Sequence, residues 1–469
     1  MSKKRKLYRL HVLLSLSLVY ACQGTQSTVN PHPPSALPSA LPSALSSPSP
    51  SPISSPISIP EFNTLSREEL EEVQSSSLVK ANNNFAFKLF ESLSAENQGK
   101  NIFFSPLSVS LALQIVWNGA QGETKNEIGK ALEIEGLKTE QMNRIASLLM
   151  RKLVKPSEDI HLEVANGIFA NDRFELIPEF SQLSQRNYFS EVRTLHFVNG
   201  STQKEINDWV SQKTHQKIPS VLNPVEDAEL AQKWEKETVM YLLNALYFKA
   251  NWSKKFEAFE TQEREFTLAD GSVKKIPMMR QFGDYNYLMP GAAYNNDFQG
   301  IELPYGQNGS LRMYIFLPSY GTSVDKIQQD ISKMDIKHLI WSFKATHGSI
   351  SLPKFKNQAQ YNLTQPLEKL GIHQAFQRSQ ADFFAMVKKR YPEDKFYISE
   401  AFQKVQLEVN EAGTEASAAT VVKYSYSGSS EPLKQMEMIC NHPFLYLIHD
   451  YETGQILFMG KVYDPSLES

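Results

Sequence analysis

The 469-residue chain has only two cysteines, Cys22 and Cys440. Two cysteines allow at most one disulfide, and none if either is modified, so the framework of several disulfides that stabilises small secreted proteins is excluded. Cys440 lies within an apolar run, which is typical of a buried thiol that packs as a small hydrophobic residue. We therefore expect the folded part of the chain to be stabilised by packing alone.

The chain also lacks an excess of charge of one sign. Its formal net charge is −3 and its pI is near 6.4. A nucleic-acid-binding protein needs a basic surface to neutralise phosphates, and nothing in this balance predicts one. We expect no nucleic-acid partner.

Motifs of enzyme chemistry are missing as well. The sequence has no Gly-x-Gly-x-x-Gly, His-Glu-x-x-His, Cys-x-x-Cys or Gly-x-Ser-x-Gly. Ser77 and Lys80 fit the Ser-x-x-Lys of β-lactamases, but the partner motifs of those enzymes are absent, and the pair begins an amphipathic helix that continues through Phe85, Leu89 and Leu93. We predict that the protein is not an enzyme and has no metal site or cofactor.

A hydrophobic run long enough to span a membrane is absent near the N-terminus. Leu10 to Tyr20 is apolar but too short for a membrane helix, and it follows a basic start at residues 3–9. This pattern predicts a secretory signal peptide over residues 1–21. The site Val19-Tyr-Ala-Cys22 resembles the bacterial lipobox, in which the cysteine is acylated, although Tyr20 is bulky for that motif and ordinary cleavage is the alternative. We expect a secreted protein anchored to a membrane through Cys22, facing the periplasm or the cell exterior.

Residues 22–60 are predicted to form a disordered tether. Residues 31–60 contain ten prolines and ten serines, and the unit Pro-Ser-Ala-Leu starts at Pro34, Pro38 and Pro42. Such a composition cannot bury a core and favours an extended chain. The remaining residues, 61–469, are enough for one large domain.

The segment from Val409 to Val422 is the most informative in the chain. Gly413 can adopt backbone angles that other residues avoid, and the nine residues after it contain no glycine or proline and one charge. With the period of a strand, one face of this segment is Thr414, Ala416, Ala418, Thr420 and Val422, and the other is Glu415, Ser417, Ala419 and Val421. The first face is small enough to slide over a packed core. The alternative interpretation is an alanine-rich helix or linker.

Ser105 and Pro106 predict the start of a helix. Serine caps the free N–H groups of a first helical turn, and proline in the first helical position loses nothing by lacking an N–H. Leu107, Leu111 and Ile115 provide apolar surface for this helix. Taken alone, these residues fit an ordinary buried helix equally well.

Six motifs in order resemble the serpins, a family of suicide-type protease inhibitors. They are Asn101 to Leu113, Asn118 to Thr124, Asn244 to Trp252, the pair Ser351–Lys356 and Leu367–Ile372, the hinge Asn410 to Ala416, and the C-terminal segments Met438–Ile448 and Gly454–Pro465. The resemblance covers about residues 78 to 465. It implies an α+β fold of about nine helices around three β-sheets, with an exposed mobile reactive-centre loop at about residues 411–434.

The resemblance also implies which residues serve the moving strand. The hinge would comprise Glu411, Gly413, Thr414, Glu415, Ala416, Ser417, Ala418, Ala419 and Thr420. Ser105, Pro106, Ser108 and Asn244 would bridge the strands that part, and Trp252 would stand where the hinge enters. Gln403 occupies a position where the family usually has histidine. Because glutamine cannot become charged near neutral pH, we expect no acid-triggered opening through this site.

By family spacing the scissile bond is Ser427–Gly428, which suits an elastase-like enzyme. Tyr426–Ser427 is the runner-up and suits a chymotrypsin- or subtilisin-like enzyme, whereas Lys423 is disfavoured because the inserted strand would be four residues short. The implied partner is a serine protease held in a covalent complex with a monomeric inhibitor. The alternative is a non-inhibitory serpin that acts as a carrier, but the hinge has no bulky or proline residue to obstruct insertion.

Overall fold

The computed structural model describes residues 64–154, 159–197, 201–223, 237–388, 395–414 and 435–467. All of them belong to one compact unit, Ser58–Ser469. The predicted signal peptide, the Cys22 site, the tether, the hinge beyond Thr414 and both candidate scissile bonds lie outside the described residues.

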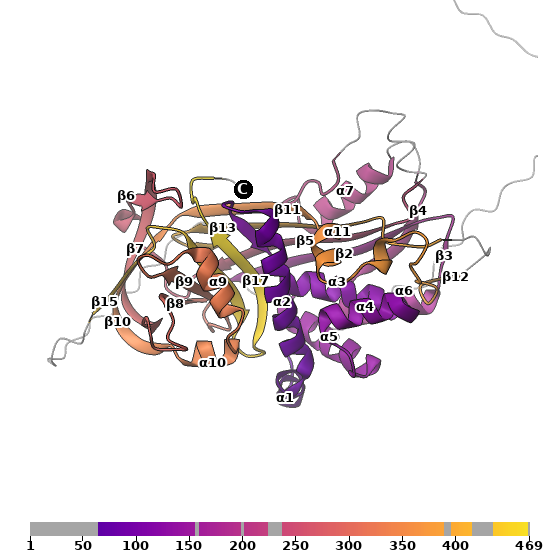
Figure 1. Cartoon of the computed structure of the whole chain (residues 1–469), viewed down its shortest axis with the longest axis horizontal. Coiled ribbons are helices and arrows are strands. Elements are labelled where there is room, and N and C mark those ends of the chain that lie inside the picture. The colour runs from indigo at the N-terminus through magenta and orange to yellow at the C-terminus, as the bar shows by residue number, and fades with distance from the viewer. Residues whose placement is uncertain are drawn as a thin grey trace, which may run out of the picture. The chain divides into compact units, whose positions relative to one another are not determined.

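Helices α1 to α5, with only the short strand β1 among them, form residues 67–153, and strands and helices alternate after them (Figure 1). The predicted helix start is confirmed, because the Ser105 side chain accepts from Ser108 N and Pro106 stands in the first turn of α3. The Ser77 segment is likewise part of a helix, α2, with Phe85, Leu89 and Leu93 buried. The described α-helices are α1 Arg67–Ser75, α2 Ser77–Glu96, α3 Pro106–Gly119, α4 Gly122–Leu132, α5 Thr139–Leu153, α6 Pro178–Tyr188, α7 Ser201–Lys213, α9 Val324–Ile331, α10 Ile336–Trp341 and α11 Thr364–Lys369, with 3-10 turns η1 Ala258–Glu260 and η2 Gln374–Phe376.

A six-stranded sheet holds the predicted hinge. Its order is β11-β13-β14-β5-β2-β4, with bounds β11 Phe355–Asn362, β13 Glu400–Asn410, β14 Gly413–Thr414, β5 Met240–Asn251, β2 Ile160–Asn171 and β4 Glu191–Leu195. Helix α3 packs against β5 on one face, and α7 packs against β2. On the α7 side, Trp209 meets Phe169 at 4.9 Å in a separate apolar cluster that also contains Tyr241 and Leu243. Because both faces of β5 are covered, its sequence is almost continuously apolar rather than alternating.

A nine-stranded sheet contains most of the second half of the chain. Strands β1, β17, β16, β9, β8, β7, β10 and β15 follow one another, and β6 pairs with β7. A two-stranded sheet of β12 and β3 stands apart from it. The bounds are β1 Ile102–Phe104, β3 Glu175–Leu176, β6 Gln262–Thr267, β7 Val273–Leu288, β8 Phe298–Tyr305, β9 Leu311–Pro318, β10 Lys344–Pro353, β12 Val387–Lys388, β15 Met436–Ile439, β16 Phe444–Asp450 and β17 Gln455–Val462.

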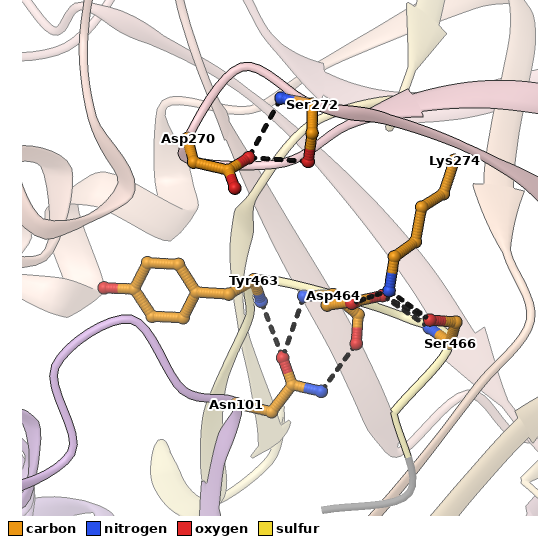
Figure 2. A network of polar contacts seen from close by, with 7 residues as sticks. All are labelled: Asn101, Asp270, Ser272, Lys274, Tyr463, Asp464 and Ser466. Carbon is orange, nitrogen blue, oxygen red and sulfur yellow. Dashed lines mark hydrogen bonds and ion pairs between the residues drawn. The ribbon is translucent and has the colours of Figure 1, made fainter. Parts of the chain in front are cut away.

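The C-terminal segment is fixed to the rest of the domain by a polar network (Figure 2). Asn101 Oδ1 accepts from the backbone N–H groups of Tyr463 and Asp464, at 2.7 and 3.0 Å, and Asn101 Nδ2 donates to Asp464 O at 2.7 Å. Lys274 at the start of β7 pairs with the Asp464 carboxylate. One buried asparagine thus satisfies three backbone groups and ties the chain's last strand beside its first.

The prediction for Cys440 also concerns a described residue. Cys440 is buried, and burial raises the pKa of its thiol, as expected of a cysteine that packs rather than reacts. Among residues 64–467, apart from the undescribed gaps, no helix is long and apolar enough to cross a membrane.

Candidate functional site

The predicted hinge is already partly inside the six-stranded sheet. Gly413 and Thr414 form β14, which pairs antiparallel with β13 on one side and with β5 on the other. Thr414 lies opposite Val409 and Ala250 and is fully buried. We expected Thr414 to belong to the exposed loop, at about residues 411–434, and to enter the sheet only after cleavage. That expectation is wrong for residues 413–414, because a free slot between β13 and β5 offers their backbone groups two strands to pair with.

Only glycine fits at position 413. Its φ is +146°, and a Cβ there would lie 2.1 Å from Ala250 O and 2.6 Å from the Cα of Asn251. Any other side chain would push the hinge away from β5. The pivot that the sequence indicated is therefore also a point of close backbone approach.

Aromatic side chains line the place where the hinge enters. Tyr305 OH lies 3.1 Å from Thr414 Oγ1, and the Tyr305 ring stacks on Trp252 with ring centroids 4.4 Å apart. Trp252 donates from its backbone N to Ala412 O and from Nε1 to Asn410 O, both at 3.0 Å. Burial raises the pKa of Tyr305, so its hydroxyl stays protonated and available to this hydrogen bond at any physiological pH. Trp252 thus holds both ends of the turn between β13 and β14.

Glu411 fixes the root of the hinge by charge. Its carboxylate lies 2.9 Å from Lys354 Nζ and accepts from Thr261 Oγ1 at 2.9 Å. Burial alone would raise the pKa of Glu411, but the hydrogen bonds from Lys354, the backbone and Thr261 together hold it below its usual value. A lowered carboxyl pKa means that this pair stabilises the hinge at neutral pH and is lost only as the pH falls through that lowered value.

A buried polar cluster joins β13, β5 and the start of α3. Gln403 Nε2 donates to Ser105 O at 2.9 Å, Ser108 Oγ at 3.0 Å and Asn244 Oδ1 at 2.8 Å, and Gln403 Oε1 accepts from Ser105 N at 3.1 Å. Ser108 Oγ also donates to Asn244 Oδ1 at 2.6 Å. The cluster contains no group that titrates near neutral pH. The bond between Gln403 and Asn244 crosses between two strands that must separate if another strand is to enter.

Beyond the hinge, β13 and β5 are paired directly with each other. Seven parallel pairs run from Gln406 opposite Tyr247 to Glu400 opposite Tyr241. At the hinge β14 therefore separates β13 from β5, and below the hinge these two strands pair directly with each other. The slot between β13 and β5 is thus open only at the end where β14 lies.

A sequence model of the family described as "Serpin (serine protease inhibitor)" matches residues 80–465, which is most of the chain. The chain is a serpin. The family resemblance read from the six motifs is thereby confirmed, and so is the α+β serpin fold.

Individual serpins agree with this assignment along nearly their whole length. Human Serpin B8 is 33% identical over 83% of this chain and 99% of its own. The leukocyte elastase inhibitor of Xenopus tropicalis is 31% identical over 83% of this chain and all of its own. The structure of tengpin, a thermophilic serpin in the native state, matches with a TM-score of 0.72 at 29% identity, covering 86% of this chain and 95% of that one.

Sequence reasoning missed several residues that complete this serpin's site. Tyr305, Lys354 and Thr261 hold the hinge, and Asn166 on β2 accepts a hydrogen bond from Asn244 Nδ2. Nothing in the sequence indicated that Lys354 would pair with Glu411. Of the predicted residues, the structure brings Ser105, Ser108, Asn244 and Gln403 into one cluster and Trp252, Gly413 and Thr414 into another, while Pro106 serves the helix start.

Proposed function

We propose that this serpin inhibits serine endopeptidases by covalent trapping, in which cleavage of the loop lets its hinge side enter the six-stranded sheet. Membership of the family, with elastase inhibitors among the relatives, supports protease inhibition in general. The observation that carries the specific mechanism is the position of Gly413 and Thr414, which already occupy the first two places of a strand between β13 and β5.

The register of β14 defines how that strand would continue. Thr414 lies opposite Val409 and Ala250 in antiparallel pairing, so each later residue falls opposite an earlier one on both neighbours. Six residues on, Thr420 would reach the row of Gln403 and Asn244; nine residues on, Lys423 would reach the row of Glu400 and Tyr241. Insertion to that row would break the parallel hydrogen bonds between β13 and β5. It would replace them with antiparallel hydrogen bonds from the new strand to both β13 and β5, which favours the inserted state.

Trapping then follows from the distance moved. The protease is attached as an acyl-enzyme at the cut bond while about fifteen residues zip in at about 3.3 Å each, so it is dragged by roughly 50 Å. Distortion that removes an oxyanion-hole donor slows deacylation by about 10²–10³ for each donor. The intact inhibitor is in this scheme kinetically rather than thermodynamically stable.

The direct test is a covalent adduct. We expect a complex that survives boiling in detergent with an elastase- or chymotrypsin-like serine protease, because Ser427 and Tyr426 suit small and aromatic specificity pockets. A panel of proteases, with mass analysis of the released C-terminal peptide, would identify the bond as Ser427–Gly428 or Tyr426–Ser427. If every protease cuts the loop and remains fully active, trapping is wrong.

Thr420 offers a finer test of the register. On insertion it would separate Gln403 from Asn244, and its hydroxyl can replace the hydrogen bond that they lose. Thr420→Val should therefore leave the intact protein's melting temperature unchanged but destabilise the cleaved protein by about 1–3 kcal/mol, since buried amide groups lose a partner. Thr420→Ser, which keeps the hydroxyl, is the matched control. Equal losses in the intact and cleaved proteins would contradict the register.

The alternative function is that of a non-inhibitory carrier. Such a protein has no need of a hinge built from small residues or of a started slot. The two functions differ in what cleavage of the loop does to the stability of the protein.

We also propose that the protein acts at a membrane surface, with lipid on Cys22, on the strength of the Val19-Tyr-Ala-Cys22 site and the Pro/Ser-rich residues after it. In a bacterial host, Cys22→Ala should move the protein from the membrane fraction to the soluble fraction. Equal membrane retention of both forms would count against lipidation.

A further inference from the structure

Four large apolar side chains are exposed around the short helix α10. Trp341 is the last residue of this helix and is 63% exposed, and Tyr451, in the turn between β16 and β17, is 48% exposed. Met289 and Tyr294 are each 51% exposed in the turn that follows β7. Tyr294 packs on His338 of α10 with ring centroids 5.2 Å apart, and Trp341 and Tyr451 line one hollow of about 660 Å³. These four side chains form one surface, which we call the α10 face.

Each of the two largest rings on the α10 face has a cation against it. Lys337 Nζ lies 4.8 Å from the centre of the Trp341 ring, and the guanidinium of Arg312 lies 3.5 Å from the centre of the Tyr451 ring. The helix beneath is fixed to the core, because Leu339 is fully buried. Tryptophan and tyrosine beside lysine or arginine are typical of the boundary between water and a lipid bilayer, where the rings meet acyl chains and the cations reach the headgroups.

The charges beside the α10 face suit an anionic surface. Lys80, Lys333 and Lys337 line the hollow together with two acids, Asp335 and Glu452. Both acids are already engaged, because the Asp335 side chain caps the N-terminus of α10 and Glu452 is in an ion pair with a lysine of α5. The three lysines are therefore available to the phosphates of anionic lipids.

The α10 face also lies close to the point where the tether joins the domain. Gln74, in the last turn of α1, lines the same hollow, and its Nε2 donates to Glu452 O at 2.7 Å, next to Tyr451. Helix α1 has nine residues, which is about 13 Å at 1.5 Å per residue. Figure 1 shows α1 and α10 at the same lower edge of the domain. The chain that precedes Thr64 therefore enters the domain within a short distance of this face.

We propose that the α10 face is a docking surface for an anionic phospholipid membrane. This inference rests on that part of the proposed function which places lipid on Cys22, because the anchor brings a membrane within reach. Residues 23–63 can extend to at most about 130 Å at about 3.1 Å per residue. A tether of this length keeps the local concentration of lipid high, so a weak contact is enough to hold the domain against the bilayer.

The test uses the full chain with Cys22→Ala, purified from the soluble fraction, so that no acyl chain contributes to binding. The contact is too weak to survive the dilution of a cell lysate, and it is measured instead by sedimentation with vesicles at millimolar lipid. We expect binding to vesicles of phosphatidylglycerol and phosphatidylethanolamine, and much weaker binding to neutral phosphatidylcholine vesicles. Binding to the anionic vesicles should fall several-fold between about 0.05 and about 0.5 M salt, because exposed charges are screened.

Two double variants test whether the α10 face makes the contact. Trp341→Ala together with Tyr451→Ala should bind the anionic vesicles about tenfold more weakly, since two rings no longer leave water. Phe259→Ala together with Phe282→Ala is the matched control, because these exposed rings belong to η1 and β7 and do not line the hollow beside α10. The control should bind like the parent protein.

Tryptophan fluorescence tests whether Trp341 itself enters the lipid. Vesicles with bromine on the acyl chains should quench the emission of the Cys22→Ala protein. Trp341→Phe keeps an aromatic ring, so this variant should bind within about twofold of the parent and lose most of the quenching. A merely structural role of Trp341 would leave the quenching unchanged.

The outcomes distinguish this proposal from the proposed function. The docking surface is overturned if the Cys22→Ala protein does not bind anionic vesicles, if it binds neutral ones equally, or if both double variants lose the same affinity. It is also overturned if the Trp341, Tyr451 variant only abolishes self-association, because the α10 face would then contact a second copy of the chain. Absence of acyl groups on wild-type Cys22, found by mass analysis, would refute lipidation and leave the vesicle result standing. Trapping of proteases, measured without lipid, should be the same for the parent and the Trp341, Tyr451 variant.

Discussion

Replacing Thr414 with arginine should convert the protein from an inhibitor into an ordinary substrate. Thr414 is fully buried between β13 and β5, with its hydroxyl beside Tyr305. An arginine there would have to bury a guanidinium without a carboxylate partner, at a cost of several kcal/mol. We therefore expect the variant's hinge to lie outside the slot even before cleavage, so that the first step of zipping is blocked. Acylation occurs at the distant scissile bond and should be untouched.

The measurement is the number of inhibitor molecules consumed per protease inactivated. Trapping is a race between insertion and deacylation, so a slow insertion raises this number steeply, by tenfold or more if the barrier rises by about 1.4 kcal/mol. Glu415→Arg is the control, because the alternation of a strand directs residue 415 away from the core when Thr414 faces it. Equal effects of the two substitutions would show that the two faces of the hinge were assigned wrongly.

Cleavage of the loop should raise the melting temperature sharply. Insertion of residues 415–423 adds a net gain of about ten hydrogen bonds at about 1 kcal/mol each, which corresponds to a rise of about 10 °C or more in the melting temperature of a domain of this size. The protein would be cut by a protease that acts anywhere in residues 424–434, and unfolding would be followed by calorimetry before and after. The Thr414→Arg variant, cut in the same way, should show a much smaller rise.

This experiment also decides between the inhibitor and the carrier. An unchanged melting temperature after complete cleavage would show that no strand enters, and the carrier function would then be favoured. A large rise without any covalent adduct would mean that the sheet opens but that none of the tested proteases is slow enough to be caught. Only a rise together with an adduct supports the full mechanism.

The sequence predicted the local features of this site well because each depends on neighbouring residues. Ser105 and Pro106 predicted a helix start because capping and the first helical position depend only on residues of one turn. The structure confirms both the serine cap and the proline in the first turn. Gly413 stood out as a pivot because the residues after it are uniformly small, and its φ of +146° fits that role. The order of six motifs was enough to identify the family and with it the fold.

The partners of these residues could not be predicted in the same way. Tyr305 is 109 residues before Thr414, and Asn166 is 78 residues before Asn244. Such contacts depend on which strands become neighbours and in which register, and one sequence does not specify a register.

By itself, then, the sequence determined the helix start and a hinge able to become a strand, because capping and small side chains are local properties. Its six motifs, by their resemblance to the serpins, also identified the family and with it the α+β fold. Only the tertiary structure decided that the hinge has already begun to enter. That depends on a slot between β13 and β5, on Trp252 and Tyr305 beside it, and on backbone groups of Gly413 and Thr414 that find two strands to pair with. The sequence contains the residues that line this slot. The space between two strands, however, exists only once the fold has placed both strands in the sheet.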